Sequence, residues 1–155
     1  YVCSIERFTF KPDIFDLISE SNRLKYKVII ITNQAGIGRG LYSEEDFKSL
    51  NHWMLKTLKE NMCFIDDVYY CPYHPTKGKG RYLRNSYDRK PKPGMIIKAA
   101  HKHKINLRNS ILIGDKYTDI KAGICAGINN LYLINNKSNY KNVKIIKSLK
   151  EVALN

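Results

Sequence analysis

Three groups of polar residues in this chain have side chains of types that bind phosphate or divalent cations. Two of these groups follow an apolar run, and one follows a long loop. The first group, Thr32, Asn33 and Gln34, follows the apolar run 28–31 and precedes three glycines within residues 36–40. A hydroxyl, an amide and the backbone N–H groups of a glycine-rich turn can all donate to phosphate oxygens. A glycine-rich turn can equally be a plain connection between a strand and a helix, so this group alone does not decide between the two.

The other two groups add cations and carboxylates. Arg89 and Lys90 come at the end of a long loop, and Asp115 follows a further apolar run, with Asp119 one helical turn later. Ligands of open parallel sheets bind at the carboxyl ends of the strands, so we expect the three groups to meet there. Asp115 suits a magnesium ligand, and Asp119 could orient Lys116 or a metal-bound water. Alternatively, the two aspartates only cap a helix whose dipole favours negative charge.

The elements that must position these groups follow from apolar periodicity and from turn and capping residues. The expected helices are 13–26, 43–61, 94–103, 117–126 and 148–154, and the expected strands are 27–32, 67–71, 110–113, 131–134 and 143–146. Ser43 and Asp46 form a capping-box pattern at the second helix, and Gly127 is the expected C-cap of the fourth. Alternating strands and helices predict a single α/β domain over residues 1–155 with an open parallel sheet.

A loop over residues 72–93 separates two of these elements. Loops of this length in compact domains are usually functional, and we expect this one to cover a substrate. We expect its tyrosines, Tyr73, Tyr82 and Tyr87, to pack it through apolar contacts.

Net charge limits which partners the protein can have, and the cysteines indicate the compartment in which it functions. The net charge is +13, from 27 Lys and Arg against 14 Asp and Glu, but the basic residues are scattered rather than gathered in a run. A small anionic substrate therefore fits as well as nucleic acid, and we do not expect nucleic acid as the partner. No run is long enough to predict a membrane partner. The four cysteines form no C-x-x-C pair, which indicates reduced thiols in a cytoplasmic protein, with Cys125 in the core.

The motifs resemble those of the haloacid dehalogenase superfamily of magnesium-dependent phosphatases. Within it they are similar to the D-glycero-D-manno-heptose 1,7-bisphosphate 7-phosphatases; the related histidinol-phosphate phosphatases share most of them. They read Thr-Asn-Gln-Ala-Gly-Ile-Gly-Arg-Gly at 32–40, Cys-Pro-Tyr-His-Pro at 71–75, Arg-Lys-Pro-Lys-Pro-Gly at 89–94 and Gly-Asp-Lys at 114–116. The glycine-loop form favours the heptose branch. The resemblance implies a Rossmann-like open parallel sheet with helices on both faces and no separate cap domain.

The resemblance also implies roles for single residues. Thr32 would hold the transferring phosphoryl group, and Lys90 would neutralise its charge, so both are catalytic candidates. Asp115 would bind Mg²⁺, with Asp119 in support. The residues assigned to substrate binding are Tyr1, Thr32, Asn33, Gln34, Ala35, Arg39, Arg89, Lys90 and Lys116. Such roles suit a reaction in which fixed cations and donors stabilise the charge of a phosphoryl group.

The implied reaction removes the C7 phosphate of D-glycero-D-manno-heptose 1,7-bisphosphate through a phospho-aspartyl intermediate, in the synthesis of ADP-heptose and lipopolysaccharide. The enzyme would be a cytoplasmic monomer acting on a small phosphorylated sugar. Three alternatives remain open: a histidinol-phosphate phosphatase, a nucleic-acid 3′-end phosphatase, and a non-catalytic protein that binds sugar phosphates.

The sequence departs from the family pattern at its start. Family members begin with a strand that ends in Asp-x-Asp-Gly, whose first aspartate is the nucleophile, but residues 1–155 contain no Asp-x-Asp. Tyr1-Val2 matches a Tyr-Val that follows this motif in the heptose enzymes. We therefore expect a truncated chain whose nucleophile and central first strand lie upstream of Tyr1; a degenerate, inactive relative is the rarer possibility.

The second departure concerns zinc. Many heptose-bisphosphate phosphatases hold a structural Zn²⁺ in the long loop with a Cys-x-His and a Cys-x-Cys pair. Here Cys71 is in register, His74 comes one place late, and the second pair is replaced by Ser86-Tyr87-Asp88. Because a structural zinc site needs four ligands, we regard Cys71 and His74 as remnants and expect Mg²⁺ but no zinc.

Overall fold

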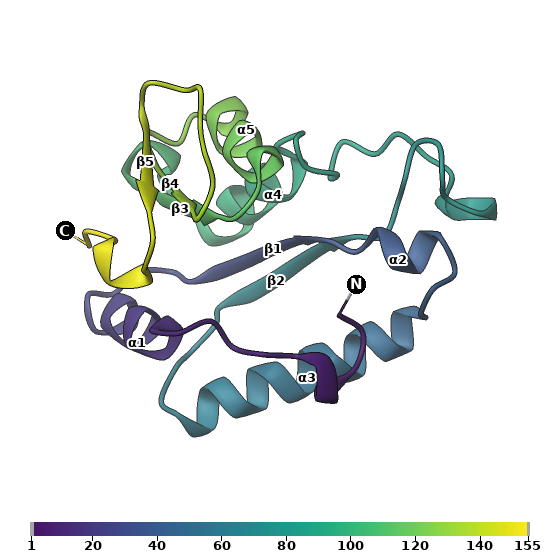
Figure 1. Ribbon diagram of the computed structural model, residues 1–155, viewed down its shortest axis with the longest axis horizontal. Helices are drawn as coiled ribbons and strands as arrows, with labels where there is room; N and C mark the ends of the chain where they lie inside the picture. Colours follow the sequence, from purple (N-terminus) through teal and green to yellow (C-terminus); the bar gives the residue numbers. More distant parts are fainter. Residues whose placement is uncertain (1, 155) are drawn as a thin grey trace. The chain divides into compact units, whose positions relative to one another are not determined.

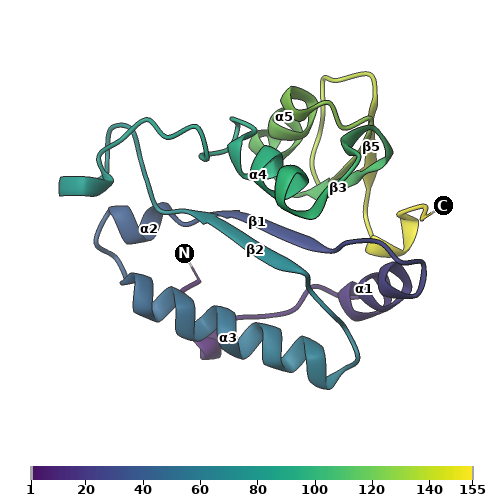
Figure 2. The same ribbon diagram turned by 180° about the vertical axis from the view of Figure 1, so that it is seen from behind.

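The computed structural model describes residues 2–154, and the chain divides into two compact units, residues 1–86 and 87–155. Figures 1 and 2 show the elements of both units from opposite sides. The first unit contains η1 (Ile5–Arg7), α1 (Ile14–Arg23), β1 (Ile29–Asn33), α2 (Ala35–Gly38), α3 (Glu44–Glu60), β2 (Asp67–Cys71) and η2 (Gly80–Tyr82). The second contains α4 (Gly94–His103), η3 (Leu107–Asn109), β3 (Ile111–Gly114), α5 (Tyr117–Ala126), β4 (Asn130–Ile134), β5 (Val143–Ile146) and η4 (Leu149–Glu151).

The first unit is built on a parallel pair of strands. β1 pairs with β2 in a register that sets Thr32 opposite Tyr70 and Asn33 opposite Cys71. The helices α1 and α3 lie on the same side of this pair in both views (Figures 1 and 2). Ile18 of α1 and Leu58 of α3 are buried in one apolar cluster, and Ile14 and Met54 pack against it. Each helix therefore turns the apolar face that its sequence predicts toward this cluster.

α3 begins where local sequence predicts it. The Ser43 hydroxyl accepts from the backbone N–H of Asp46 at 3.0 Å, and the Asp46 carboxylate accepts from the backbone N–H of Ser43 at 2.8 Å. This capping box satisfies N–H groups that have no partner inside the helix. It therefore fixes the position of Glu44, the first residue of α3.

The second unit is a three-stranded parallel sheet in the order β3-β4-β5. α5 joins β3 to β4 and ends at Gly127, whose φ of 83° is the left-handed conformation expected of a glycine C-cap. Tyr132 and Leu133 of β4 and Ile120 of α5 are almost fully buried. Short parallel strands with buried central residues are the pattern of an α/β layer.

The prediction of a parallel α/β fold is confirmed, but the strands form two sheets rather than one. Within residues 2–154, β1 is paired with β2 alone and β3 with β4 alone. The expectation of one domain over residues 1–155 stays a prediction.

Three local expectations are wrong. Residues 35–38 form the helical turn α2 instead of an open glycine loop. The expected helix over 148–154 is only the 3₁₀ turn η4, because Val152 is extended and the backbone N–H of Ala153 donates to the Tyr132 hydroxyl at 3.2 Å. Cys125 is exposed, so it is not a core residue.

Among the described residues, no helix combines the length and apolar character needed to cross a bilayer.

Candidate functional site

The predicted site residues of the first unit gather where β1 ends. Thr32 and Asn33 are its last two residues, and Gln34 follows as the N-cap of α2. The Gln34 backbone N–H donates to the carbonyl of Cys71 at 2.8 Å, which extends the pairing of β1 with β2 by one bond. All three side chains are half-buried, whereas Ala35 is buried. The sequence predicted that these polar residues stand at the end of a strand, and the structure places them there.

Gln34 links two hydroxyl groups. Its side-chain nitrogen Nε2 donates to Thr32 Oγ1 at 3.0 Å, and its oxygen Oε1 accepts from the Tyr42 hydroxyl at 2.5 Å. Gln34 was predicted as a substrate-binding residue, and Tyr42 was not predicted at all. The bonds show that the Gln34 amide is used within the protein, beside the threonine hydroxyl.

The glycines after Gln34 are required by side chains and backbone that approach them closely. A Cβ atom on Gly36 would lie 2.0 Å from Cε1 of Tyr42, and one on Gly38 would lie 2.3 Å from the carbonyl oxygen of Pro72. Both distances are far below van der Waals contact. The glycine spacing therefore has a packing role here: it seats the Tyr42 ring and the start of the long loop.

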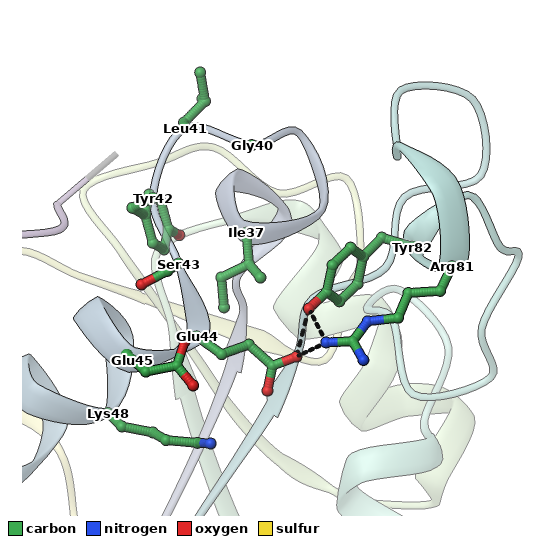
Figure 3. A pocket seen from close by; sticks show the side chains of 10 residues that line it. All are labelled: Ile37, Gly40, Leu41, Tyr42, Ser43, Glu44, Glu45, Lys48, Arg81 and Tyr82. Carbon is green, nitrogen blue, oxygen red and sulfur yellow. Dashed lines mark hydrogen bonds and ion pairs between the residues drawn. The ribbon is translucent and has the colours of Figure 1, made fainter.

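The long loop is held by Glu44, at the start of α3. The Glu44 carboxylate accepts from the Tyr82 hydroxyl at 2.7 Å and from the Tyr70 hydroxyl at 2.9 Å. Arg81 adds an ion pair at 3.6 Å to Glu44 and donates to the Tyr82 hydroxyl at 2.7 Å. Figure 3 shows Glu44, Tyr82 and Arg81 turned toward one another. The first unit thus fixes the middle of the loop through a carboxylate.

These bonds change the acid–base properties of the cluster. Hydrogen bonds from Tyr82 and then from Tyr70 lower the pKa of Glu44, against the opposing effect of burial. Burial, and then the bond to Glu44, raises the pKa of Tyr70 to about 12. Charged Glu44 and neutral Tyr70 are therefore the stable forms over a wide range of pH.

The expectation of apolar packing in the loop is correct only in part. The rings of Tyr73 and Tyr82 lie 6.1 Å apart, and Arg84 lies over the Tyr73 ring at 4.6 Å. Tyr82 is nevertheless held mainly through its hydroxyl, and Tyr87 is 60% exposed, so the prediction is wrong for Tyr87.

A cavity of about 560 Å³ adjoins the Glu44 cluster in the first unit. Its walls include Tyr42, which precedes the N-cap of α3, Glu44 and Lys48 of α3, and Arg81 and Tyr82 of the loop (Figure 3). The same residues that fix the loop thus border the cavity.

In the second unit, Lys90 and Asp119 form a buried ion pair. Lys90 Nζ lies 2.7 Å from Asp119 Oδ1, with only 12% and 9% of the two side chains exposed. Asp119 Oδ2 also accepts from the backbone N–H of Lys116 at 3.0 Å. The helix-capping alternative for Asp119 is therefore correct, and the same carboxylate holds the ammonium group of a predicted catalytic residue.

Gly114 allows this arrangement. A Cβ atom on Gly114 would lie 2.4 Å from Cβ of Asp119, so the glycine makes room for the carboxylate at the end of β3. Asp115, the next residue, is exposed, as is Lys116. Asp115 thus stands at the carboxyl end of a rigid strand with its side chain toward solvent, as a metal ligand or substrate contact would require.

For three further predicted site residues, the structure gives few details of their contacts. Arg39 and Arg89 are both half-buried and both take part in interactions within the protein. Tyr1 lies outside the described residues, so its predicted role in substrate binding stays a prediction.

Curated relatives match most of the chain. The D-glycero-alpha-D-manno-heptose-1,7-bisphosphate 7-phosphatase of Burkholderia mallei is 48% identical over 134 residues, which are 86% of this chain and 71% of the relative. The corresponding beta-named phosphatase of Haemophilus influenzae is 41% identical over 83% of this chain and 69% of its own length. The chain belongs to the D-glycero-D-manno-heptose 1,7-bisphosphate 7-phosphatase family. A HAD-hydrolase-like family model also matches residues 87–151, which lie in the second unit.

Solved structures share the fold of this chain. A crystal structure from Mesorhizobium loti, described as a HAD-like phosphatase, has a TM-score of 0.88 and 28% identity, covering 96% of this chain and 72% of that one. The D,D-heptose 1,7-bisphosphate phosphatase of B. bronchiseptica, solved with magnesium and phosphate, has a TM-score of 0.83 over 95% of this chain and 83% of that one. At 21% identity it shows the shared fold alone.

The donor set fits the magnesium that phosphatases of this superfamily generally use. Mg²⁺ is usually held by one or two carboxylates with waters and substrate phosphate, and Asp115 offers one exposed carboxylate at a strand end. Among residues 2–154, no group of three or more His, Cys, Asp or Glu side chains is placed to hold a metal ion by itself.

The zinc remnant residues have other surroundings in this member of the heptose-phosphatase family. Cys71 is completely buried at the end of β2. His74 Nδ1 accepts from the backbone N–H groups of Thr76 at 3.3 Å and Lys77 at 3.0 Å, so this nitrogen shapes a turn of the loop. The absence of zinc stays a prediction.

Sequence reasoning missed Tyr42 and Glu44 and misjudged the role of Tyr82. The one signal that the sequence carries for Tyr42 is Gly36, since a glycine often stands where another group approaches the backbone closely. Glu44 has no such signal, because a glutamate in the first turn of a helix is explained by the helix dipole alone.

Proposed function

We propose that this protein removes the C7 phosphate of D-glycero-D-manno-heptose 1,7-bisphosphate in a magnesium-dependent reaction. The observation that carries the proposal is the 48% identity, over 134 residues, with a curated phosphatase of that specificity. Relatives named for the alpha and for the beta anomer both match closely, so the proposal covers the heptose bisphosphate without choosing the anomer.

The first unit binds the phosphoryl group that is transferred. The Thr32 hydroxyl donates to a phosphate oxygen, and the Asn33 side chain and the backbone N–H of Ala35, at the start of α2, add further donors. Thr32 is only half-buried, so its hydroxyl remains within reach of a ligand. Such donors stabilise the negative charge that spreads over the equatorial oxygens of the phosphoryl group during transfer.

The second unit supplies charge. The Lys90 ammonium group is held by the buried Asp119 carboxylate, so its position is fixed before substrate arrives. A fixed cation costs no reorganisation when charge develops on the phosphoryl oxygens. Asp115 is the residue that would hold Mg²⁺, and the ion would supply positive charge to neutralise the phosphoryl group.

The remaining assignments concern the sugar and its second phosphate. Arg89, next to Lys90, contacts the C1 phosphate or the sugar, and the loop 72–93 covers the substrate. Arg39 and Lys116 add positive charge. In the family pattern the nucleophile is the first aspartate of an Asp-x-Asp motif, and residues 1–155 contain no such motif. The protein acts as a cytoplasmic monomer on this small sugar phosphate, without nucleic acid.

The test is to follow phosphate release by phosphorus NMR, using protein made from the native gene with any residues encoded before Tyr1. With Mg²⁺ and heptose 1,7-bisphosphate, we expect the C7 phosphate signal to disappear while the C1 phosphate signal remains. Histidinol phosphate and a 3′-phosphorylated oligonucleotide are the comparison substrates. Faster release from either would replace the proposed substrate. Binding of heptose bisphosphate without any phosphate release would instead favour the non-catalytic alternative.

A salt titration separates the nucleic-acid alternative further. Binding to a phosphate backbone weakens steeply with ionic strength because counterions are released. We expect kcat/KM for the heptose bisphosphate to fall only weakly over the same salt range.

A further inference from the structure

The Thr32 hydroxyl has one side already occupied by a donor. Because Gln34 Nε2 donates to Thr32 Oγ1 at 3.0 Å, the threonine oxygen acts as an acceptor in this bond. A hydroxyl group has one proton to donate and two lone pairs to accept with. Accepting from Gln34 therefore leaves the Thr32 proton available for a different acceptor, such as a phosphate oxygen.

The orientation of the Gln34 amide decides whether the Thr32 proton is available to a ligand. If the amide were turned by half a rotation, its oxygen would face Thr32 and would take the threonine proton for itself. In the structure the oxygen instead accepts from the Tyr42 hydroxyl at 2.5 Å. Tyr42 thus binds the far end of the amide and restrains its rotation. A phenol hydroxyl can also accept, so this orientation is held while the Tyr42 proton is donated to the amide oxygen, as it is in the structure.

The position of Tyr42 is itself constrained. Gly36 lies directly beside the ring, since a Cβ atom there would be 2.0 Å from Cε1 and 2.8 Å from the hydroxyl oxygen of Tyr42. The backbone N–H of Leu41 donates to the Gly36 carbonyl at 2.9 Å and so ties the residue before Tyr42 to the same glycine. Tyr42 forms part of the cavity wall (Figure 3). Backbone and glycine together therefore hold the phenol against Gln34.

We propose that Tyr42 is a positioning residue, which acts through Gln34 to preset the Thr32 hydroxyl as a donor to the transferring phosphoryl group. The inference rests on the proposed function, because it takes Thr32 as the residue that binds this group. Tyr42 itself does not contact the phosphoryl group. Its hydroxyl keeps the Gln34 amide in the orientation that leaves the threonine proton free.

The test compares Tyr42→Phe with the unchanged protein in turnover of heptose bisphosphate and in binding of inorganic phosphate. Phenylalanine keeps the ring against Gly36 and removes only the hydroxyl. We expect kcat to fall roughly 3- to 10-fold, the effect of one ordinary hydrogen bond, and the affinity for phosphate to fall by a similar factor. The Gln34 side-chain amide signals in NMR should shift or broaden. Tyr140→Phe is the matched control: it deletes a phenol hydroxyl that bonds to Tyr117 at 2.6 Å and should leave all these values unchanged.

A double-mutant cycle with Thr32→Val separates positioning from a general structural role. If Tyr42 acts through Thr32, then Tyr42→Phe should have no further effect on kcat or on phosphate affinity in the Thr32→Val background. Equal losses in both backgrounds would overturn the inference, because Tyr42 would then act independently of Thr32. Unchanged kcat and phosphate affinity in Tyr42→Phe would overturn it as well.

The binding readout keeps this inference distinct from the proposed function. A protein that binds phosphate but releases none from the bisphosphate would contradict the proposed function alone. In that case, loss of phosphate affinity in Tyr42→Phe, dependent on Thr32, would still support the positioning role. A protein that binds no phosphate at all would overturn both.

Discussion

The Tyr82 hydroxyl donates to Glu44 Oε1 at 2.7 Å, which fastens the middle of the long loop to the first turn of α3. The bond joins residues that are 38 positions apart, and the two share the cavity of the first unit. A carboxylate thereby holds the loop in place. The position of the loop in this protein should depend on Glu44.

Glu44→Gln is therefore expected to loosen the loop. Glutamine has one acceptor oxygen where the carboxylate has two, and it cannot form the ion pair with Arg81. We expect trypsin to cleave within residues 77–84 roughly 5- to 10-fold faster, the effect of losing about one hydrogen bond. Glu45→Gln, which changes the exposed neighbouring residue, is the control. Equal cleavage rates for Glu44→Gln and the unchanged protein would show that Glu44 does not hold the loop.

The same cluster predicts two limits of pH. Because the pKa of Glu44 is lowered on folding, its contribution is present above its unfolded value and is lost as pH falls through the folded value. The pKa of Tyr70 is raised from 10.0 to about 12, so its contribution is present below 10.0 and is lost as pH rises toward about 12. We expect the cluster to weaken at both extremes.

Ultraviolet absorbance of tyrosinate checks the alkaline limit. One tyrosine should ionise near pH 12 in the unchanged protein, and this step should disappear in Tyr70→Phe. In Glu44→Gln the step should move to lower pH, because a charged acceptor no longer favours the neutral phenol. If Tyr70 ionised at the same pH in Glu44→Gln as in the unchanged protein, the hydrogen bond from Tyr70 to Glu44 would be contradicted.

Lys90→Ala should impair both stability and activity. It leaves the Asp119 carboxylate, whose side chain is only 9% exposed, without its ion-pair partner. Breaking a buried pair from one side costs about 3–5 kcal/mol, measured as the free energy of unfolding. We also expect kcat to fall about 100- to 1,000-fold, since a fixed cation is removed from the phosphoryl group.

A second variant separates these two effects. The double change Lys90→Met with Asp119→Asn replaces both charges, so it should regain much of the lost stability. It should not regain activity, because the ammonium group is still absent. Recovery of kcat together with stability would show that Lys90 serves the fold and not the reaction.

Asp115→Asn should weaken the response to magnesium. An amide replaces the only predicted magnesium-binding carboxylate, so the Mg²⁺ concentration for half-maximal activity should rise at least about 10-fold. Asp66→Asn is the control, because Asp66 is a carboxylate of the first unit that pairs with Lys27 at 2.7 Å. Calorimetric titration of Mg²⁺ in the presence of phosphate gives a second readout. An unchanged magnesium requirement would remove Asp115 from the site.

Gly38→Ala should disturb the loop from its other end. A Cβ atom there would lie 2.3 Å from the Pro72 carbonyl oxygen, and backbone cannot yield as a flexible side chain can. We expect the protein to lose about 1–3 kcal/mol of unfolding free energy, with faster cleavage of the loop by trypsin. Thermal unfolding unchanged from that of the original protein would show that the loop can shift without cost.

Much of the fold could be predicted because its signals are local. The capping box of Ser43 and Asp46 and the glycine C-cap at Gly127 involve residues a few positions apart, and the helix over 94–103 was predicted with its observed bounds. The order of strand-end polar groups also predicted where Thr32 and Asp115 would stand. The turn at residues 35–38 was misjudged, since its glycines pointed to a loop while tertiary packing made it helical.

The sequence by itself determined the alternation of strands and helices, the family, and which residue types stand at the strand ends. Only the tertiary structure decided which of them interact: Lys90 with Asp119, Tyr82 with Glu44, and Tyr42 with Gln34. The physical reason is that a capping bond depends on neighbours along the chain, whereas a side-chain pair between separate elements depends on the path of the chain between them. Two glycines show the difference most directly, because Gly36 and Gly38 are explained by Tyr42 and Pro72 and not by their own neighbours in sequence.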